Sequence, residues 1–180
     1  MNKILEIQRK LQNIYKTSAD TTVKVPSVLQ AMEWKYFAED YAKAAKLVAE
    51  TSPELWLQRL LLTGHSIELA LKAYLLASGV QPPKEHSLIK LYCLVSDKGF
   101  ELSELEQACI VHLEHFYSKD LATQTKYKAR YPTTRSERLG GAVPDHSVFE
   151  AIVRSLCEQV EKISAAKLSI IESLPSRTDA

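Results

Sequence analysis

Three side chains in the stretch GHSIELALKAYLLASG, residues 64–79, are of types that could do acid–base chemistry: His65, Glu68 and Lys72. On a helix they fall within about 60° of one another, because each residue turns the chain by about 100°. Glu68 stands four residues before Lys72, the order that favours an ion pair. No nucleophile or metal partner accompanies them, so we interpret them as a structural polar stripe. The surrounding helix is apolar almost all round and therefore central, which leaves the stripe facing solvent, another helix or a second subunit.

Two Arg–His pairs could serve a ribonuclease, in which the arginine stabilises phosphate charge and the histidine acts as acid or base. Arg59 and His65 would diverge by about 120° and lie about 9 Å apart along one continuous helix, so this pair is unfavourable. Arg138 and His146 form a looser Arg-x7-His pair at the end of a basic stretch. They are the candidate catalytic residues.

The sequence HLEH places His112 and His115 one turn apart, with Glu114 between them. Two histidines could contribute to a metal site, but such a site needs a third or fourth ligand, which the sequence does not supply. We interpret them as surface or core-edge histidines, and we expect no metal and no cofactor. Serine-hydrolase and phosphate-loop motifs are also absent from the sequence.

The strongest local charge pattern is KYKARYPTTRSER, residues 126–138. Basic side chains alternate there with tyrosines, a mixture that grips phosphates and stacks on bases. The pattern predicts a contact surface for nucleic acid, and the alternative is a solvated basic loop that its tyrosines anchor to the protein. The residues predicted to bind nucleic acid are Lys126, Lys128, Arg130, Tyr131 and Arg135.

The elements that must position these residues are all predicted to be helices. Five Gly and seven Pro in 180 residues leave little room for the many turns of an all-β fold. Periodicity and capping patterns predict helices over about 3–15, 28–50, 51–78, 87–97, 103–118 and 146–173. Two capping boxes, Thr51 with Glu54 and Ser103 with Glu106, begin helices, and Asp145 can cap the last one.

The helix over 28–50 is predicted to be amphipathic. One face would carry its larger apolar residues, which are Leu29, Met32, Tyr36, Phe37, Ala44 and Leu47. The other face would point outward with Lys35, Asp40, Lys43 and Lys46.

The predicted fold is all-α, an up-and-down four-helix bundle with extra short helices. We expect an N-terminal helix and connector over 1–27, the bundle over 28–174 and a disordered tail over 175–180. The net charge of +1 gives no overall attraction to nucleic acid. There is no signal-peptide core and no apolar run long enough to span a membrane. The three cysteines lack C-x-x-C spacing, so we expect reduced thiols in a cytoplasmic protein.

GHSIELALKAYLLASG, followed at the expected distance by KEHSLIKLY and later by KARYP, resembles the HEPN superfamily over about residues 34–165. The resemblance implies a four-helix bundle, often a homodimer, that associates with RNA or nucleotides in toxin–antitoxin, defence or stress settings. Catalytic members are metal-independent ribonucleases with an Arg-x4-6-His motif. Here Arg59 and His65 lie before the family's helix core, and the spacing of Arg138 and His146 is one residue too long.

We therefore expect a non-catalytic module that binds RNA or a nucleotide. One alternative is a divergent ribonuclease that uses Arg138 and His146 across a dimer cleft. Another is a protein-binding subunit of antitoxin type, with a nucleotidyltransferase or another protein as partner, and no membrane partner is expected. Under the main hypothesis, Glu68 and Lys72 interact with the turn near His86 and fix how the helices pack.

Overall fold

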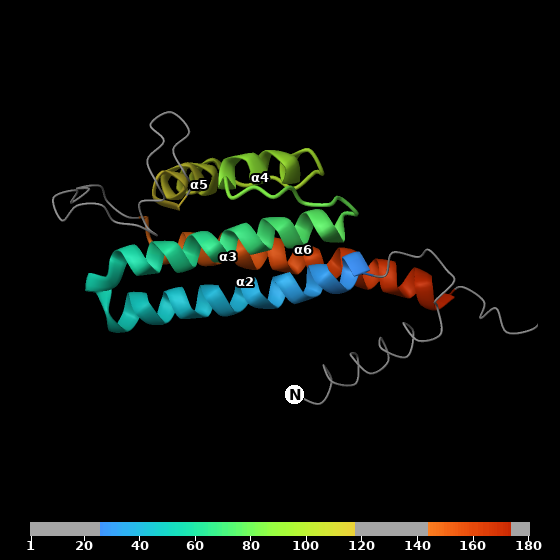
Figure 1. The fold of residues 1–180 in the computed structure, drawn as a ribbon, viewed down its shortest axis with the longest axis horizontal. Coiled ribbons are helices and arrows are strands. Elements are labelled where there is room, and N and C mark those ends of the chain that lie inside the picture. Colours follow the sequence, from blue (N-terminus) through green and yellow to red (C-terminus); the bar gives the residue numbers. More distant parts are fainter. Residues whose placement is uncertain (1–25, 118–143, 174–180) are drawn as a thin grey trace, which may run out of the picture.

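The computed structural model describes residues 26–117 and 144–173, and every regular element in that part of the chain is a helix. The elements are α2 (Pro26–Thr51), the short 3-10 helix η1 (Pro53–Leu55), α3 (Trp56–Ala77), α4 (Leu88–Ser96), α5 (Glu104–Tyr117) and α6 (His146–Ser173). The long helices α2 and α3 run antiparallel, with α6 behind them (Figure 1). The shorter α4 and α5 follow one another along α3 and together complete the bundle (Figure 1). The predicted all-α bundle with extra short helices is confirmed.

The central helix is α3, which contacts every other helix of the described chain. Its fully buried apolar side chains include Ile67, Leu71 and Leu75. The segment Pro53–Ala77 is long and apolar enough to resemble a membrane span, yet 78% of its most apolar window is buried inside the bundle. Core packing therefore accounts for its apolar composition.

Several predicted helix ends are confirmed by their hydrogen bonds. The backbone N–H of Ser103 donates to the Glu106 carboxylate at 2.8 Å, and the N–H of Glu106 donates back to the Ser103 hydroxyl at 3.4 Å. The N–H of Ser147 donates to the Asp145 carboxylate at 2.8 Å and so caps α6. Gly79 ends α3 in the left-handed region, with φ +85°, where a residue without Cβ is favoured. These local patterns fix where α5 and α6 begin.

The capping box predicted at Thr51 is wrong. Thr51 is the last residue of α2, and its hydroxyl donates to the carbonyl of Leu47 at 2.7 Å. An N-cap residue lies directly before the helix that it caps, but residues 52–55 separate Thr51 from the start of α3, and no side-chain cap bond begins η1 or α3. Pro53 instead begins η1, and α3 begins at Trp56.

The predicted orientation of α2 is also wrong for three of its large apolar side chains. Tyr36, Phe37 and Leu47 are 43%, 49% and 59% exposed. The buried face is formed mainly by small residues, which are Ala31, Ala38 and Ala45. Small side chains allow α2 to lie close against α3, so these three larger residues remain on the outer face of the bundle.

Lys35, predicted to point outward, is buried between α2 and α6 at 4% exposure. Its ammonium group pairs with Glu161 of α6 and lies 3.0 Å from the Glu39 carboxylate. Burial opposes the charge, but the hydrogen bonds to Glu161 and Glu39 hold the pKa of Lys35 above its usual value. Beside this pair, burial raises the pKa of the Cys157 thiol to about 12, so the thiol is neutral and unreactive.

Candidate functional site

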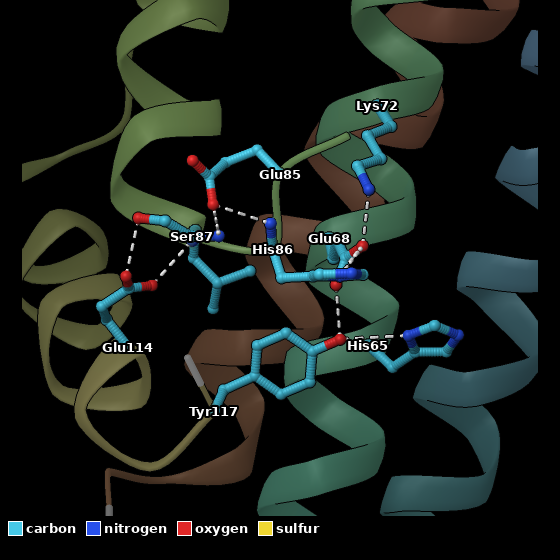
Figure 2. Close-up of polar contacts among 9 residues, drawn as sticks. His65, Glu68, Lys72, Glu85, His86, Ser87, Glu114 and Tyr117 are labelled. Carbon is cyan, nitrogen blue, oxygen red and sulfur yellow. Dashed lines mark hydrogen bonds and ion pairs between the residues drawn. The ribbon is translucent and has the colours of Figure 1, made fainter. Parts of the chain in front are cut away.

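A buried polar network surrounds Glu68 in the middle of α3 (Figure 2). Glu68 is 2% exposed, and three groups approach its carboxylate. The ammonium of Lys72 donates to it at 2.6 Å, and the hydroxyl of Tyr117 donates at 2.5 Å. The Nδ1 atom of His86, from the segment between α3 and α4, lies 3.0 Å away. The network therefore joins α3 to the end of α5 and to the segment that leads into α4.

Tyr117 is the last residue of α5 and occupies a space that a glycine leaves open. A Cβ atom at Gly64 would lie 2.3 Å from Cδ2 of the Tyr117 ring. The Tyr117 hydroxyl also lies 3.1 Å from Nδ1 of His65. The His65 ring meets Tyr41 of α2 edge-on, with 4.5 Å between the ring centroids. Gly64 thus permits the contact that links α5, α3 and α2.

Burial and hydrogen bonding set the charge of the network. Burial opposes ionisation of Glu68, but the hydrogen bonds from Lys72 and Tyr117, with the nearby ammonium charge, hold the pKa of Glu68 below its usual value of 4.5. The carboxylate is therefore charged near neutral pH, with its oxygens already engaged. A charged and partnered carboxylate is poorly suited to act as a general acid or base there.

Glu114, a member of the HLEH stretch, anchors the start of α4. One of its carboxylate oxygens accepts from the Ser87 hydroxyl at 2.6 Å, and the other accepts from the Leu88 backbone N–H at 2.6 Å. The rings of His112 and His115 lie 5.2 Å and 5.3 Å from that of Phe116. Among the described residues, no group of three or more His, Cys, Asp or Glu side chains could hold a metal ion.

A second polar cluster lies at the first turn of α6. Both ring nitrogens of His146 are buried and have no hydrogen-bond partner among the described residues. Burial lowers the pKa of His146; Glu150 opposes this change, while the positive charges of Arg59 and Lys46 add to it. The ring is therefore neutral at pH 7, with one nitrogen able to accept a proton.

The buried hydroxyl of Thr63, on α3, likewise has no partner within the described chain, although Thr63 is only 3% exposed. Thr63 and His146 line the same small hollow, which is too narrow to hold a water molecule. The hollow is therefore too small to be a ligand pocket.

Comparison with known families identifies the chain. A family model described as HEPN domain matches residues 31–170. The chain belongs to the HEPN family. The match extends from α2 through most of α6, so it includes both polar clusters of this HEPN domain. Comparisons with curated proteins and with solved structures gave no match.

Of the candidate site residues of this HEPN domain, the polar stripe is brought together and the Arg59–His65 pair is not. His65, Glu68 and Lys72 all belong to the network around Glu68. Arg59 and His65 lie six residues apart on the continuous helix α3, where their side chains diverge by about 120°, and the charge of Arg59 acts on His146. The remaining candidates lie outside the described residues, and they are Lys126, Lys128, Arg130, Tyr131, Arg135 and Arg138.

Two members of these clusters were not singled out by sequence reasoning. Tyr117 is far from Glu68 in the sequence, and only the mid-helical Gly64 hints that a bulky group approaches α3 there. Thr63 has no sequence pattern that would set it apart, because its importance depends on the neighbouring α6.

Proposed function

We propose that this HEPN domain is a non-catalytic RNA-binding module whose contact surface lies where α5 ends and α6 begins. The end of α5, the start of α6 and the turn between α2 and α3 gather at one end of the bundle (Figure 1). In the sequence, the basic and tyrosine-containing stretch 126–138 connects α5 to α6. The stretch is therefore attached on both sides to this end of the molecule.

The described helices bring two basic side chains to the same end of the bundle. Arg59 of α3 and Lys46 of α2 both act on His146, and Arg59 also acts on Asp145. Glu150, which pairs with Lys46 at 3.2 Å, and Asp145 offset part of this charge, so most of the attraction for a phosphate backbone must come from the stretch 126–138. The observation that carries the proposal is that Arg59 and both attachment points of the basic stretch share one end of the bundle. RNA is favoured over a small nucleotide because the hollow beside His146 is too narrow for a ligand.

The proposal is tested by fluorescence anisotropy with labelled single-stranded RNA. A triple variant, Lys126→Ala, Lys128→Ala and Arg130→Ala, should bind at least about tenfold more weakly, because it removes three phosphate contacts. The matched control neutralises three exposed lysines of other regions, Lys84, Lys90 and Lys98. Equal losses in the two variants would show non-specific attraction and would contradict the proposed surface.

A ribonuclease is the second candidate, and the neutral ring of His146 favours it. In that case His146 would take the proton of a ribose 2′-hydroxyl, whose oxygen attacks the adjacent phosphorus while Arg138 holds the phosphate. The P–O5′ bond breaks, the 5′-oxygen leaves with a proton from water, and a 2′,3′-cyclic phosphate forms. Wild type and His146→Ala are incubated with labelled RNA in EDTA. Cleavage that is lost in the variant would establish the enzyme, whereas binding without cleavage supports the module.

A protein-binding role is the outcome if RNA is neither bound nor cut. A nucleotidyltransferase or another toxin–antitoxin subunit would then be the partner to test by co-purification. Homodimer formation is part of the proposal and is measured by sedimentation. A cytoplasmic setting is also part of the proposal, and the free thiols of Cys93, Cys109 and Cys157 support it.

A further inference from the structure

The outer face of α2 carries large apolar side chains and is not covered by another described helix. In the described chain, α2 packs against α3, α6 and η1 and makes no contact with α4 or α5. Its exposed side chains Tyr36, Phe37 and Leu47 lie within about 100° of one another around the helix axis. Exposed aromatic and aliphatic side chains that share one helix face are typical of a surface that another element covers.

We propose that the N-terminal segment of the same chain, residues 3–15, docks on this face of α2. The segment has an apolar stripe of its own when it is placed on a helix. Ile4, Ile7, Leu11 and Ile14 fall within about 80° of one another. A helix of about 13 residues is marginal alone in water, so an apolar partner surface is what would stabilise it.

The length of the chain fits this arrangement. Residues 16–25 connect the segment to Pro26, where α2 begins, and ten extended residues span up to about 33 Å. Phe37 lies about 16 Å along the helix from Pro26, and Leu47 lies about 32 Å from it. The segment can therefore fold back over the whole exposed face. Its own helical length of about 20 Å matches the roughly 16 Å between Tyr36 and Leu47.

The charges of the two surfaces are complementary. Glu33 and Asp40 are exposed and lie between Tyr36 and Phe37 around the helix axis. Asp40 pairs with Lys43 of the same face at 3.3 Å, so Glu33 is the acidic group that a basic flank of the segment would meet. In the segment, Lys3 and Lys10 flank the apolar stripe. Opposite charges beside an apolar contact favour one partner and one register. Charge therefore favours the N-terminal segment over a partner whose apolar surface is flanked by acidic side chains.

The test is hydrogen–deuterium exchange on the full chain. In the wild type, the amides of residues 3–15 should exchange at least about tenfold more slowly than an unstructured peptide. Phe37→Glu should remove this protection, because it places a charge in the apolar contact. The matched control is Leu105→Glu on α5, where the native side chain is 62% exposed, and this variant should keep the protection. Circular dichroism verifies that both variants remain folded.

Three results would overturn the inference. Residues 3–15 could exchange at the unstructured rate in the wild type, which would show that they do not dock. Protection that survives Phe37→Glu would place the segment elsewhere. Protection that disappears on dilution, together with a dimer in sedimentation, would show that a second copy of the chain covers the face. None of these results depends on RNA binding, so the inference stands or falls independently of the proposed function.

Discussion

The network around Glu68 and the surroundings of His146 are both polar clusters against α3, but they differ in whether their atoms have partners. The Glu68 carboxylate has three partners within 3.0 Å. The ring nitrogens of His146 and the hydroxyl of Thr63 have none in the described chain. A buried polar atom without a hydrogen-bond partner lowers the free energy of unfolding by about 1–3 kcal/mol. The partnered cluster therefore stabilises the fold, whereas burial of the unpartnered atoms in the other cluster opposes folding.

The two clusters also differ in whether they position the chain or carry a group that could react. The network fixes Tyr117, the last residue before the stretch that leads to 126–138, and so determines where the proposed contact surface departs from the bundle. His146 stands where the chain returns to the bundle. Changes to the network should act first on stability, and changes at His146 should act first on RNA binding or cleavage.

The largest expected effect comes from Lys72→Ala, which leaves the Glu68 carboxylate buried without its ammonium partner. Breaking a buried ion pair from one side destabilises by about 3–5 kcal/mol. Thermal unfolding followed by circular dichroism should show a clearly lower Tm. The control is Lys90→Ala, whose side chain is 54% exposed and pairs with Glu85, so a change within about 0.5 kcal/mol is expected. An unchanged Tm in Lys72→Ala would refute the structural role of the network.

Gly64→Ala should change the free energy of unfolding by less than Lys72→Ala, and the sign of the change tests the contact with Tyr117. In a helix interior this substitution normally stabilises by up to about 1 kcal/mol. Here the new Cβ would overlap the Tyr117 ring, so we expect destabilisation by about 1–3 kcal/mol in urea unfolding. Stabilisation by Gly64→Ala would mean that Tyr117 does not pack where the structure has it.

The smallest effect expected is a pH dependence of stability from Glu68. Its pKa is lower in the folded chain than the usual 4.5, so the unfolded chain binds the proton more readily. The stabilisation is complete above the usual carboxyl pKa and is lost as the pH falls through the folded pKa. The difference in unfolding free energy between wild type and Glu68→Gln should shrink on acidification below about pH 4.5. A difference that is constant with pH would show that the pKa of Glu68 is the same in the folded and unfolded chains.

Local patterns predicted much of the fold and part of the polar network. The capping residues Ser103 and Asp145 act within a few residues of themselves, so the sequence alone could identify them. The same logic failed at Thr51, because a capping pattern does not show whether the hydroxyl belongs to the helix before it or after it. Helical spacing could place Glu68 beside Lys72, since both lie on α3.

The rest depends on packing between elements. Periodicity showed that α2 has two faces, but the close approach of α3 decided that Ala38 is buried and Phe37 exposed. Tyr117 joins Glu68 across 49 positions, and Arg59 of α3 acts on His146 of α6. Such neighbours are set by the bundle as a whole, which one sequence does not specify residue by residue.

The most direct test of the central claim is the salt dependence of RNA binding. Each phosphate contact with single-stranded RNA contributes about −0.7 to the slope of log affinity against log salt concentration. If the basic stretch is the contact surface, replacing Lys126, Lys128 and Arg130 by alanine should make the slope shallower by about 2. The slope of the control variant at Lys84, Lys90 and Lys98 should equal that of the wild type. A wild type that does not bind RNA, or a slope that the substitutions at 126, 128 and 130 leave unchanged, would contradict the account.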